Sequence, residues 1–206
     1  MARNLPEHNH EEDNLEHIPT TRLEAFSDGV LAVIITITVL GFKVPEGGTF
    51  LAIRPLLPLF ITYAISFQTV GTYWNNHHHL LNATSHVSVG MMWANLNLLF
   101  WLSFIPFTTG WLGANHGGAV PTAVYAAILL LCSISYSLLQ WQVVRHSEKR
   151  KQIFVELVKS KKGMVSLLCY FLAVILAFAS PIISDILIIF VSVIWFIPDR
   201  RIAKYI

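Results

Sequence analysis

The stretch from Arg22 to Leu40 reads RLEAFSDGVLAVIITITVL and is the most informative part of the chain. An apolar run of about 20 residues is long enough for one helix to cross the hydrocarbon core of a bilayer. Arg22, Glu24 and Asp28 stand at the head of this run. Ionisable groups in such a place are costly unless they face one another or a water-filled cavity. The stretch therefore predicts a membrane helix with one side turned toward other protein groups or a water-filled cavity and not toward lipid.

The composition of the whole chain also indicates a membrane protein. Its 206 residues are 54% hydrophobic and 13% charged, whereas a soluble domain averages roughly 25% charged residues. So few charges cannot cover a globular surface in water. The formal net charge of +2 is too small to favour nucleic acid as a partner, and the basic residues are not interleaved with aromatic side chains as on nucleic-acid-binding surfaces.

Six apolar stretches predict six membrane helices and an all-α fold. They cover about 23–42, 54–75, 88–112, 119–143, 163–180 and 182–198. Pro106 predicts a kink in the third stretch, and Ser180-Pro181 predicts a turn between the last two. Residues 1–21 are polar and predict a disordered tail. The expected organisation is therefore this cytoplasmic tail followed by one six-helix domain at 22–206.

The distribution of Lys and Arg predicts the orientation in the membrane. With six spans, twelve of the 14 basic residues lie on the side that holds both termini, and the other two are Lys43 and Arg54. Because cytoplasmic loops carry the excess of Lys and Arg, both termini are expected in the cytoplasm. The loop Arg145–Lys162 holds seven of the twelve. Two interpretations of this loop stay open, a topology signal alone or a basic surface that binds anionic lipid.

One face of the first helix has two interpretations. Val33, Ile37 and Leu40 share this face at i, i+4 and i+7 spacing, with Thr36 beside them. The commoner role of such an apolar stripe is contact with another helix. The alternative is the lining of a pore, in which apolar side chains close a constriction and a hydroxyl replaces part of the hydration shell of an ion. Spacing alone does not decide between the two.

A polar cluster follows the second apolar stretch and reads Trp74-Asn75-Asn76-His77-His78-His79. The predicted topology places it on the same side as Arg22 and Asp28. Those two residues lie on different faces of their helix, so each is expected to bond to another helix or subunit. Indole, amide and imidazole groups can satisfy a carboxylate there. Three consecutive histidines point about 100° apart and cannot all face one ion, so no structural metal site is expected.

The segment Arg22-x-x-x-Phe26-Ser27-Asp28-Gly29, followed by the Val/Ile/Thr/Leu run and Lys43-Val-Pro45, resembles the start of the transmembrane protein 175 family. These proteins are potassium channels known as lysosomal in animals and also found in bacteria and archaea. The six-span layout and the Trp74-x-x-His77 pair extend the resemblance over about residues 20–200. The resemblance implies a homotetramer of single six-helix units, the prokaryotic form, with an axial pore lined by the first helix.

The resemblance also assigns roles to residues of the first helix. It implies an apolar constriction at Val33, continued by Ile37 and Leu40, and a hydroxyl layer at Thr36 where a permeating K⁺ is transiently held. Val33 stands where the family usually has Ile or Leu, and its smaller side chain implies a wider constriction. The family further implies a hydrogen-bonded knot that serves assembly, formed by Arg22, Phe26, Ser27, Asp28, Trp74 and His77.

The expected protein is a potassium-selective leak channel of a prokaryotic plasma membrane, with no enzymatic activity and no cofactor. One alternative is a proton channel or proton-coupled transporter that uses Asp28 and the histidines. Transporters commonly show inverted repeats and broken helices, and neither is evident here. A second alternative is a membrane enzyme or metal-binding protein built on His77–His79. A third is a structural membrane subunit that does not conduct.

Overall fold

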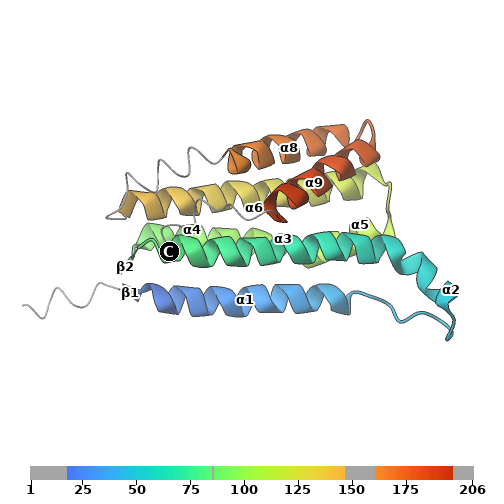
Figure 1. The fold of residues 1–206 in the computed structure, drawn as a ribbon, viewed down its shortest axis with the longest axis horizontal. Coiled ribbons are helices and arrows are strands. Elements are labelled where there is room, and N and C mark those ends of the chain that lie inside the picture. The colour runs from blue at the N-terminus through green and yellow to red at the C-terminus, as the bar shows by residue number, and fades with distance from the viewer. Residues whose placement is uncertain (1–17, 85, 147–160, 197–206) are drawn as a thin grey trace, which may run out of the picture.

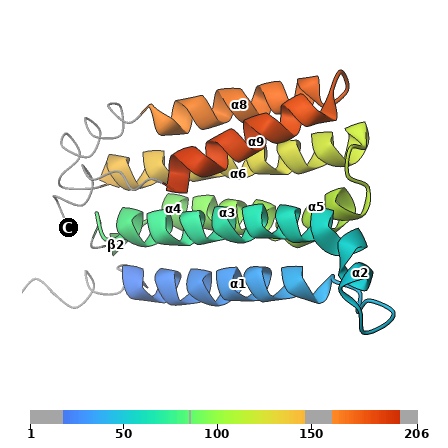
Figure 2. The ribbon, with the colours of Figure 1, turned by 45° about the vertical axis from the view of Figure 1, so that its right-hand side comes forward.

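The computed structural model describes residues 18–84, 86–146 and 161–196. Within these ranges the chain forms an elongated bundle of helices that run side by side (Figure 1). The helices are α1 (Thr20–Leu40), α2 (Phe50–Ile53), α3 (Leu57–Leu81), α4 (Val89–Leu102), α5 (Ile105–Ala114), α6 (Ala119–His146), α8 (Lys162–Leu176) and α9 (Pro181–Phe196). A 3₁₀ turn, η2 (Arg54–Leu56), joins α2 to α3. In two views α1 lies at one edge of the bundle and α8 at the opposite edge (Figures 1 and 2).

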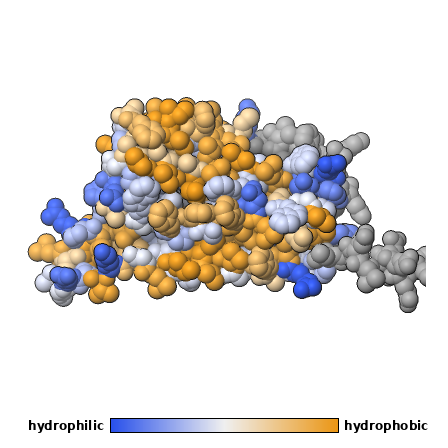
Figure 3. All heavy atoms as spheres, turned by 180° about the vertical axis from the view of Figure 1, so that it is seen from behind, coloured by the Kyte–Doolittle hydropathy of each residue, from blue (hydrophilic) through white to orange (hydrophobic). Residues whose placement is uncertain are grey.

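Four helical stretches are long and apolar enough to cross a membrane, so the chain is a multi-pass membrane protein. They are Thr20–Leu40, Phe50–Leu81, Val89–Ala114 and Ala119–His146. Apolar side chains cover most of the middle of the bundle, and strongly hydrophilic residues lie toward its two ends (Figure 3). The helices α8 and α9 are apolar but have only 15 and 16 residues. The count of six full spans therefore stays a prediction.

Several helix limits differ by a few residues from those expected, and two of them concern polar residues that were taken as helix ends. The helix α3 continues to Leu81 and so contains His77–His79, whereas its apolar stretch ends near residue 75. The helix α1 begins at Thr20, inside the expected tail. Residues 1–17 lie outside the described residues, so their disorder stays a prediction.

The third span bends just before Pro106, as its sequence predicts. The helix α4 ends at Leu102, α5 begins at Ile105, and Ser103–Phe104 form the turn between them. Proline has no backbone N–H to continue the helix, and in α5 it occupies the first turn, where that N–H would be unpaired in any case. The predicted turn at Ser180-Pro181 is also confirmed, since α9 begins at Pro181.

The described fold is all-helical, as expected, apart from one very short pair of strands. Strand β1 (Ile18–Pro19) pairs with strand β2 (His86–Val87) in a two-residue antiparallel bridge. The bridge joins the chain just before α1 to the connection between α3 and α4 (Figure 1). A stretch of two residues is too short for the alternation of side chains that identifies a strand in a sequence.

The described basic residues stand at or near helix ends. Lys43 and Arg54 lie on either side of α2, whereas Arg22 is in the first turn of α1, Arg145 in the last turn of α6 and Lys162 at the start of α8. This division agrees with the grouping used to predict the topology. Residues 147–160 lie outside the described residues, so the expectation of lipid binding at Arg145–Lys162 stays a prediction.

The helix α1 packs against α3, α4 and α5. It does so with one face, whose buried residues are Leu23, Ser27, Leu31, Ile34 and Thr38. Their spacing of three or four residues matches the 3.6-residue period of a helix. On the far side of the molecule, α8 and α9 pack against α6 and against each other. In a single copy of the chain, the other side of α1 is therefore left uncovered.

Candidate pore helix and its hydrogen-bond networks

The uncovered side of α1 carries the residues of the predicted constriction. In a single subunit the exposed fractions are 52% for Val33, 49% for Ile37 and 78% for Leu40. Thr36 is exposed beside them, and Arg22 and Phe26 are exposed at the start of the same helix. This side is available either to lipid or to further copies of the chain.

The hydroxyl of Thr36 is oriented by its own helix. Its Oγ1 lies 3.0 Å from the carbonyl oxygens of both Ala32 and Val33. Because those carbonyls only accept, the single hydroxyl hydrogen points back at the backbone. The oxygen lone pairs remain to accept a hydrogen bond from water or to coordinate a cation.

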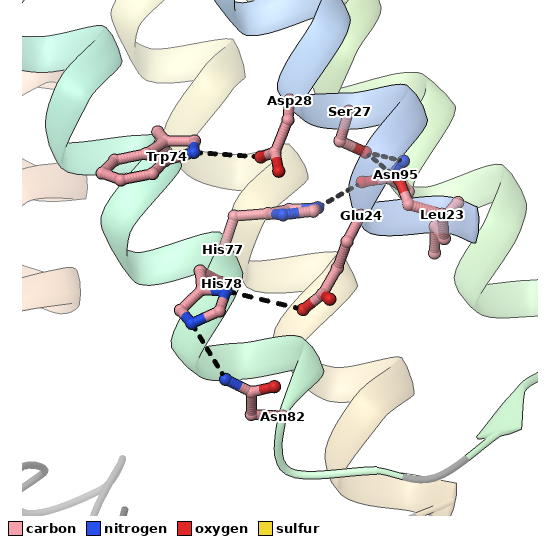
Figure 4. A network of polar contacts seen from close by, with 9 residues as sticks. All are labelled: Leu23, Glu24, Ser27, Asp28, Trp74, His77, His78, Asn82 and Asn95. Atoms are coloured by element: carbon pink, nitrogen blue, oxygen red, sulfur yellow. Dashed lines mark hydrogen bonds and ion pairs between the residues drawn. The ribbon is translucent and has the colours of Figure 1, made fainter. Parts of the chain in front are cut away.

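The buried face of α1 is tied to α3 and α4 by what we call the Asn95 network, formed by Leu23, Ser27, Asn95 and His77 (Figure 4). The Ser27 hydroxyl donates to the Leu23 carbonyl at 2.8 Å, and the Asn95 amide nitrogen donates to Ser27 Oγ at 2.9 Å. His77 Nε2 lies 2.7 Å from Asn95 Oδ1. An amide oxygen can only accept, so Nε2 of His77 carries the proton. The direction of every hydrogen bond in the network is thereby fixed.

Two further contacts join α1 to α3 beside this network (Figure 4). The indole Nε1 of Trp74 donates to Asp28 Oδ1 at 2.9 Å. His78 Nδ1 lies 3.7 Å from Glu24 Oε1, and that buried oxygen has no hydrogen bond among the described residues. The three consecutive side chains of the histidine run thus have separate surroundings, since His77 meets Asn95 while His78 meets Glu24.

The structure brings together Ser27, Asp28, Trp74 and His77 of the predicted knot, but it does not include all of its members. Arg22 makes no hydrogen bond or ion pair with the rest of the described chain. Phe26 is 53% exposed in a single subunit.

The central residue of the Asn95 network was missed in the sequence. Asn95 is fully buried in α4. The signal was present, because an amide in an apolar membrane run usually hydrogen-bonds across helices. Asn95 and Asn97 are the two amides in the apolar run from Met91 to Leu102, but spacing within one segment does not show which residues of other helices they contact.

A second buried network, which we call the Tyr125 network, ties α3, α5 and α6 together. Its members are Ile105, Thr109, Ser66 and Tyr125. Thr109 Oγ1 donates to the Ile105 carbonyl at 2.7 Å. Ser66 Oγ lies 2.6 Å from Thr109 Oγ1 and 2.8 Å from the Tyr125 hydroxyl. Since the Thr109 hydrogen is already used, Ser66 donates to Thr109 and Tyr125 donates to Ser66. No residue of α1 takes part.

Comparison with known proteins identifies the family. The family model described as endosomal/lysosomal potassium channel TMEM175 matches residues 22–106. A Chryseobacterium protein (strain P1-3) named as a potassium channel is 43% identical over 183 residues, which cover 89% of this chain and 95% of that protein. The chain belongs to the TMEM175 family. This is a family of ion channels and not of enzymes.

Other TMEM175 relatives extend the comparison. Proteins of Streptomyces collinus and Chamaesiphon minutus, both named potassium channels, are each 32% identical, over 60% and 59% of this chain and 64% of each relative. A solved structure, described as a lysosomal potassium-selective channel TMEM175 homolog from Chamaesiphon minutus, has a TM-score of 0.74. It is 27% identical, and the match covers 85% of this chain and 95% of that chain.

The mammalian members carry a different name. The mouse protein is named an endosomal/lysosomal proton channel TMEM175 and is 27% identical over 199 residues. That match covers 86% of this chain but 40% of the mouse protein. The permeant ion is thus named differently within the TMEM175 family.

Proposed function

We propose that this TMEM175 family member is a potassium-selective leak channel. The names of the three bacterial relatives support K⁺ as the permeant ion, and the relative from Chryseobacterium matches over nearly its whole length. The description of the similar solved structure also states potassium selectivity. Conduction is passive and requires no cofactor.

The proposed pathway is an axial pore formed by α1 of four copies. The observation that carries this proposal is the half-exposed apolar stripe of Val33, Ile37 and Leu40 on the side of α1 that faces away from its own bundle. One helix cannot enclose a pore, but four copies around an axis can bring these stripes together. A partly dehydrated K⁺ passes the stripe, and the outward lone pairs of Thr36 replace part of its water shell.

The Asn95 network and the Trp74–Asp28 bond hold α1 in the rotation that this pore requires. The buried side of α1 turns toward α3 and α4, which leaves Val33 and Ile37 on the outside. We place both termini in the cytoplasm and the protein in a prokaryotic plasma membrane, from the excess of Lys and Arg at the end with β1 and β2.

The proposal is tested by the reversal potential of the purified protein in planar bilayers, with K⁺ on one side and Na⁺ on the other. A current that reverses toward the K⁺ equilibrium potential is expected. Reversal near zero would contradict the selectivity and implicate the small side chain of Val33. An intact tetramer that carries no current would contradict conduction itself.

The pore assignment has a matched pair of variants. Val33 in α1 and Val193 in α9 are 52% and 55% exposed. Val33→Asn is expected to hydrate the constriction, raise the conductance and relax the selectivity, whereas Val193→Asn leaves both unchanged. Equal currents from the two variants would contradict the assignment of α1 as the helix that lines the pore.

A proton channel is the second candidate, because the mammalian relatives carry that name. A proton path would use Asp28 or the histidines, and His77 is a buried member of this set. His77→Gln keeps a side-chain N–H for Asn95 but cannot titrate. If protons are the main permeant ion, a pH gradient drives a current that this variant loses. If the proposal is right, the K⁺ current of the variant persists.

A further inference from the structure

Aromatic rings hold the end of α1 that carries Leu40. Phe42 lies two residues beyond Leu40, the last residue of α1, and its ring contacts Phe60 and Tyr63 of α3 at centroid distances of 4.7 and 5.4 Å. The rings meet edge to face, at interplanar angles of 60° and 86°, an arrangement that aromatic pairs prefer. We call Phe42, Phe60 and Tyr63 the Phe42 clasp.

The position of Phe42 follows from the period of α1. Phe42 comes four residues after Thr38, the last residue of the buried face of this helix, and its backbone N–H donates to the Val39 carbonyl at 3.1 Å, so the helical turn continues to it. Residues two apart in an α-helix point roughly 200° apart. A Phe42 ring that faces α3 therefore leaves Leu40 facing away from α3, as the proposed pore requires.

The α3 side of the Phe42 clasp is itself fixed. Leu59, the neighbour of Phe60, lies so close to α5 that a Cβ atom added at Gly113 would be 2.7 Å from Leu59 Cα. Close packing of this kind leaves little room for that end of α3 to shift. By contrast, among the described residues no side-chain hydrogen bond joins the second half of α1 to another helix, because the hydroxyls of Thr36 and Thr38 bond to α1 itself.

We infer that Phe42 is a positioning residue for the constriction. Its ring, held against α3, sets the rotation of the last turn of α1 and thereby the direction of Leu40. The helix is then fixed at two points, by the Asn95 network at its start and by the Phe42 clasp at its end, with the apolar stripe between them. The effect of Phe42 on ion selectivity rests on the proposed function, whereas its effect on the position of α1 does not.

A pair of spin labels within one copy tests the position of α1. The labels are attached at Leu40→Cys and Val120→Cys, since Val120 is 52% exposed at the start of α6. The native cysteines, Cys132 and Cys169, are replaced by Ala, and excess unlabelled chain ensures that each assembly carries one labelled copy. Phe42→Ala is expected to broaden the distribution of distances between the two labels, because the end of α1 loses both ring contacts.

The start of α1 supplies an internal control. A second pair of labels at Phe26→Cys and Val120→Cys is expected to keep its distance distribution in the Phe42→Ala variant, since the Asn95 network still holds that end. Phe60→Leu removes one ring from the α3 side and should broaden the Leu40 distribution by less. This milder variant also carries the test if Phe42→Ala does not fold.

Two further variants separate the ring contact from a general loss of apolar surface. Phe42→Tyr keeps an aromatic ring and should keep the narrow distribution. Phe178 follows the end of α8 by two residues, as Phe42 follows the end of α1, and it is 66% exposed. Phe178→Ala should therefore leave both distributions unchanged.

Reversal potentials in planar bilayers, with K⁺ on one side and Na⁺ on the other, test the link to selectivity. Phe42→Ala is expected to lower the K⁺/Na⁺ permeability ratio by roughly tenfold, the fold-change that corresponds to the loss of two ring pairs. Phe42→Tyr should keep the ratio of the unmodified chain, and so should Phe178→Ala.

The outcomes distinguish the inference from the proposed function. An unchanged Leu40 distribution in the folded Phe42→Ala variant would overturn the inference, as would equal broadening at Phe26 and Leu40. A K⁺ current whose permeability ratio is the same with and without the Phe42 ring would also overturn it. Broadening confined to Leu40, in a protein that carries no K⁺ current, would support the role of Phe42 in holding α1 and overturn the proposed function.

Discussion

The Asn95 network and the Tyr125 network are built alike but hold different parts of the molecule. Each is a directed series of hydrogen bonds that ends on a backbone carbonyl, and each joins three helices. The Asn95 network joins α1 to α3 and α4. The Tyr125 network joins α3, α5 and α6 and does not reach α1.

This difference divides α1 into two halves. Its first half is fixed by side-chain hydrogen bonds to other helices through Ser27 and Asp28. In its second half the hydroxyls of Thr36 and Thr38 bond to their own helix. Packing must therefore hold that half. Just after its end, the ring of Phe42 contacts those of Phe60 and Tyr63, at centroid distances of 4.7 and 5.4 Å. The candidate constriction begins where hydrogen bonding to neighbouring helices ends.

The largest effect is expected from Asn95→Leu, which removes the centre of the network that holds α1. The N–H of His77 and the oxygen of Ser27 each lose a buried partner, which costs about 2–4 kcal/mol in total. We expect a clear fall in the thermal midpoint of unfolding of the protein in detergent. Asn97→Leu in the same helix is the control, because Asn97 bonds to Ser135 and not to α1. Equal losses from the two variants would show that α1 is not held by this network.

The next largest loss of stability is expected at the close approach of α3 and α5, near the Tyr125 network. A Cβ atom added at Gly113 would lie 2.7 Å from Leu59 Cα, so the two backbones must separate. Gly113→Ala is expected to lower stability by about 1–3 kcal/mol, the usual cost of overpacking. Gly110→Ala in the same helix meets nothing within 4 Å and should be neutral or slightly stabilising. The measurement is the thermal midpoint of both variants.

A smaller loss is expected from Ser66→Ala in the middle of the Tyr125 network. The Tyr125 hydroxyl then has no acceptor, which costs about 1–2 kcal/mol. Because no member of this network lies on α1, the K⁺/Na⁺ selectivity of the surviving channels should not change. Ser137→Ala is the control, since that hydroxyl bonds only to a carbonyl of its own helix. A change in reversal potential for Ser66→Ala would break the division between the two networks.

The smallest effect is expected from Trp74→Phe, which removes the indole donor to Asp28. The bond is exposed in a single subunit, so its loss costs about 0.5–1.5 kcal/mol. If the proposed tetramer forms, its fraction should fall slightly when the Trp74→Phe variant is diluted. Trp93→Phe, at an exposed indole in α4, should leave it unchanged. If Trp74→Phe lost more stability than Asn95→Leu, the Trp74–Asp28 bond would hold α1 more strongly than the Asn95 network does, which is the reverse of the order proposed.

The sequence predicted the features that depend on one segment at a time. Pro106 and Ser180-Pro181 gave the correct breaks, and the period of Val33, Ile37 and Leu40 gave a face that the structure leaves exposed. The residues that it missed act between segments. Asn95 meets partners 18 and 68 positions away along the chain, and no local pattern encodes such distances.

The two short helices at the edge opposite α1 have a consequence for the surrounding lipid. Over the described residues these helices have 15 and 16 residues and rise roughly 22–24 Å, less than the hydrocarbon thickness of about 30 Å. Hydrophobic mismatch of this kind is relieved by thinning the adjacent bilayer. The neighbouring helix α6 has 28 residues and needs no such relief. The bilayer around each subunit should therefore be uneven in thickness, with its thinnest annulus along α8 and α9, where short-chain lipids would collect.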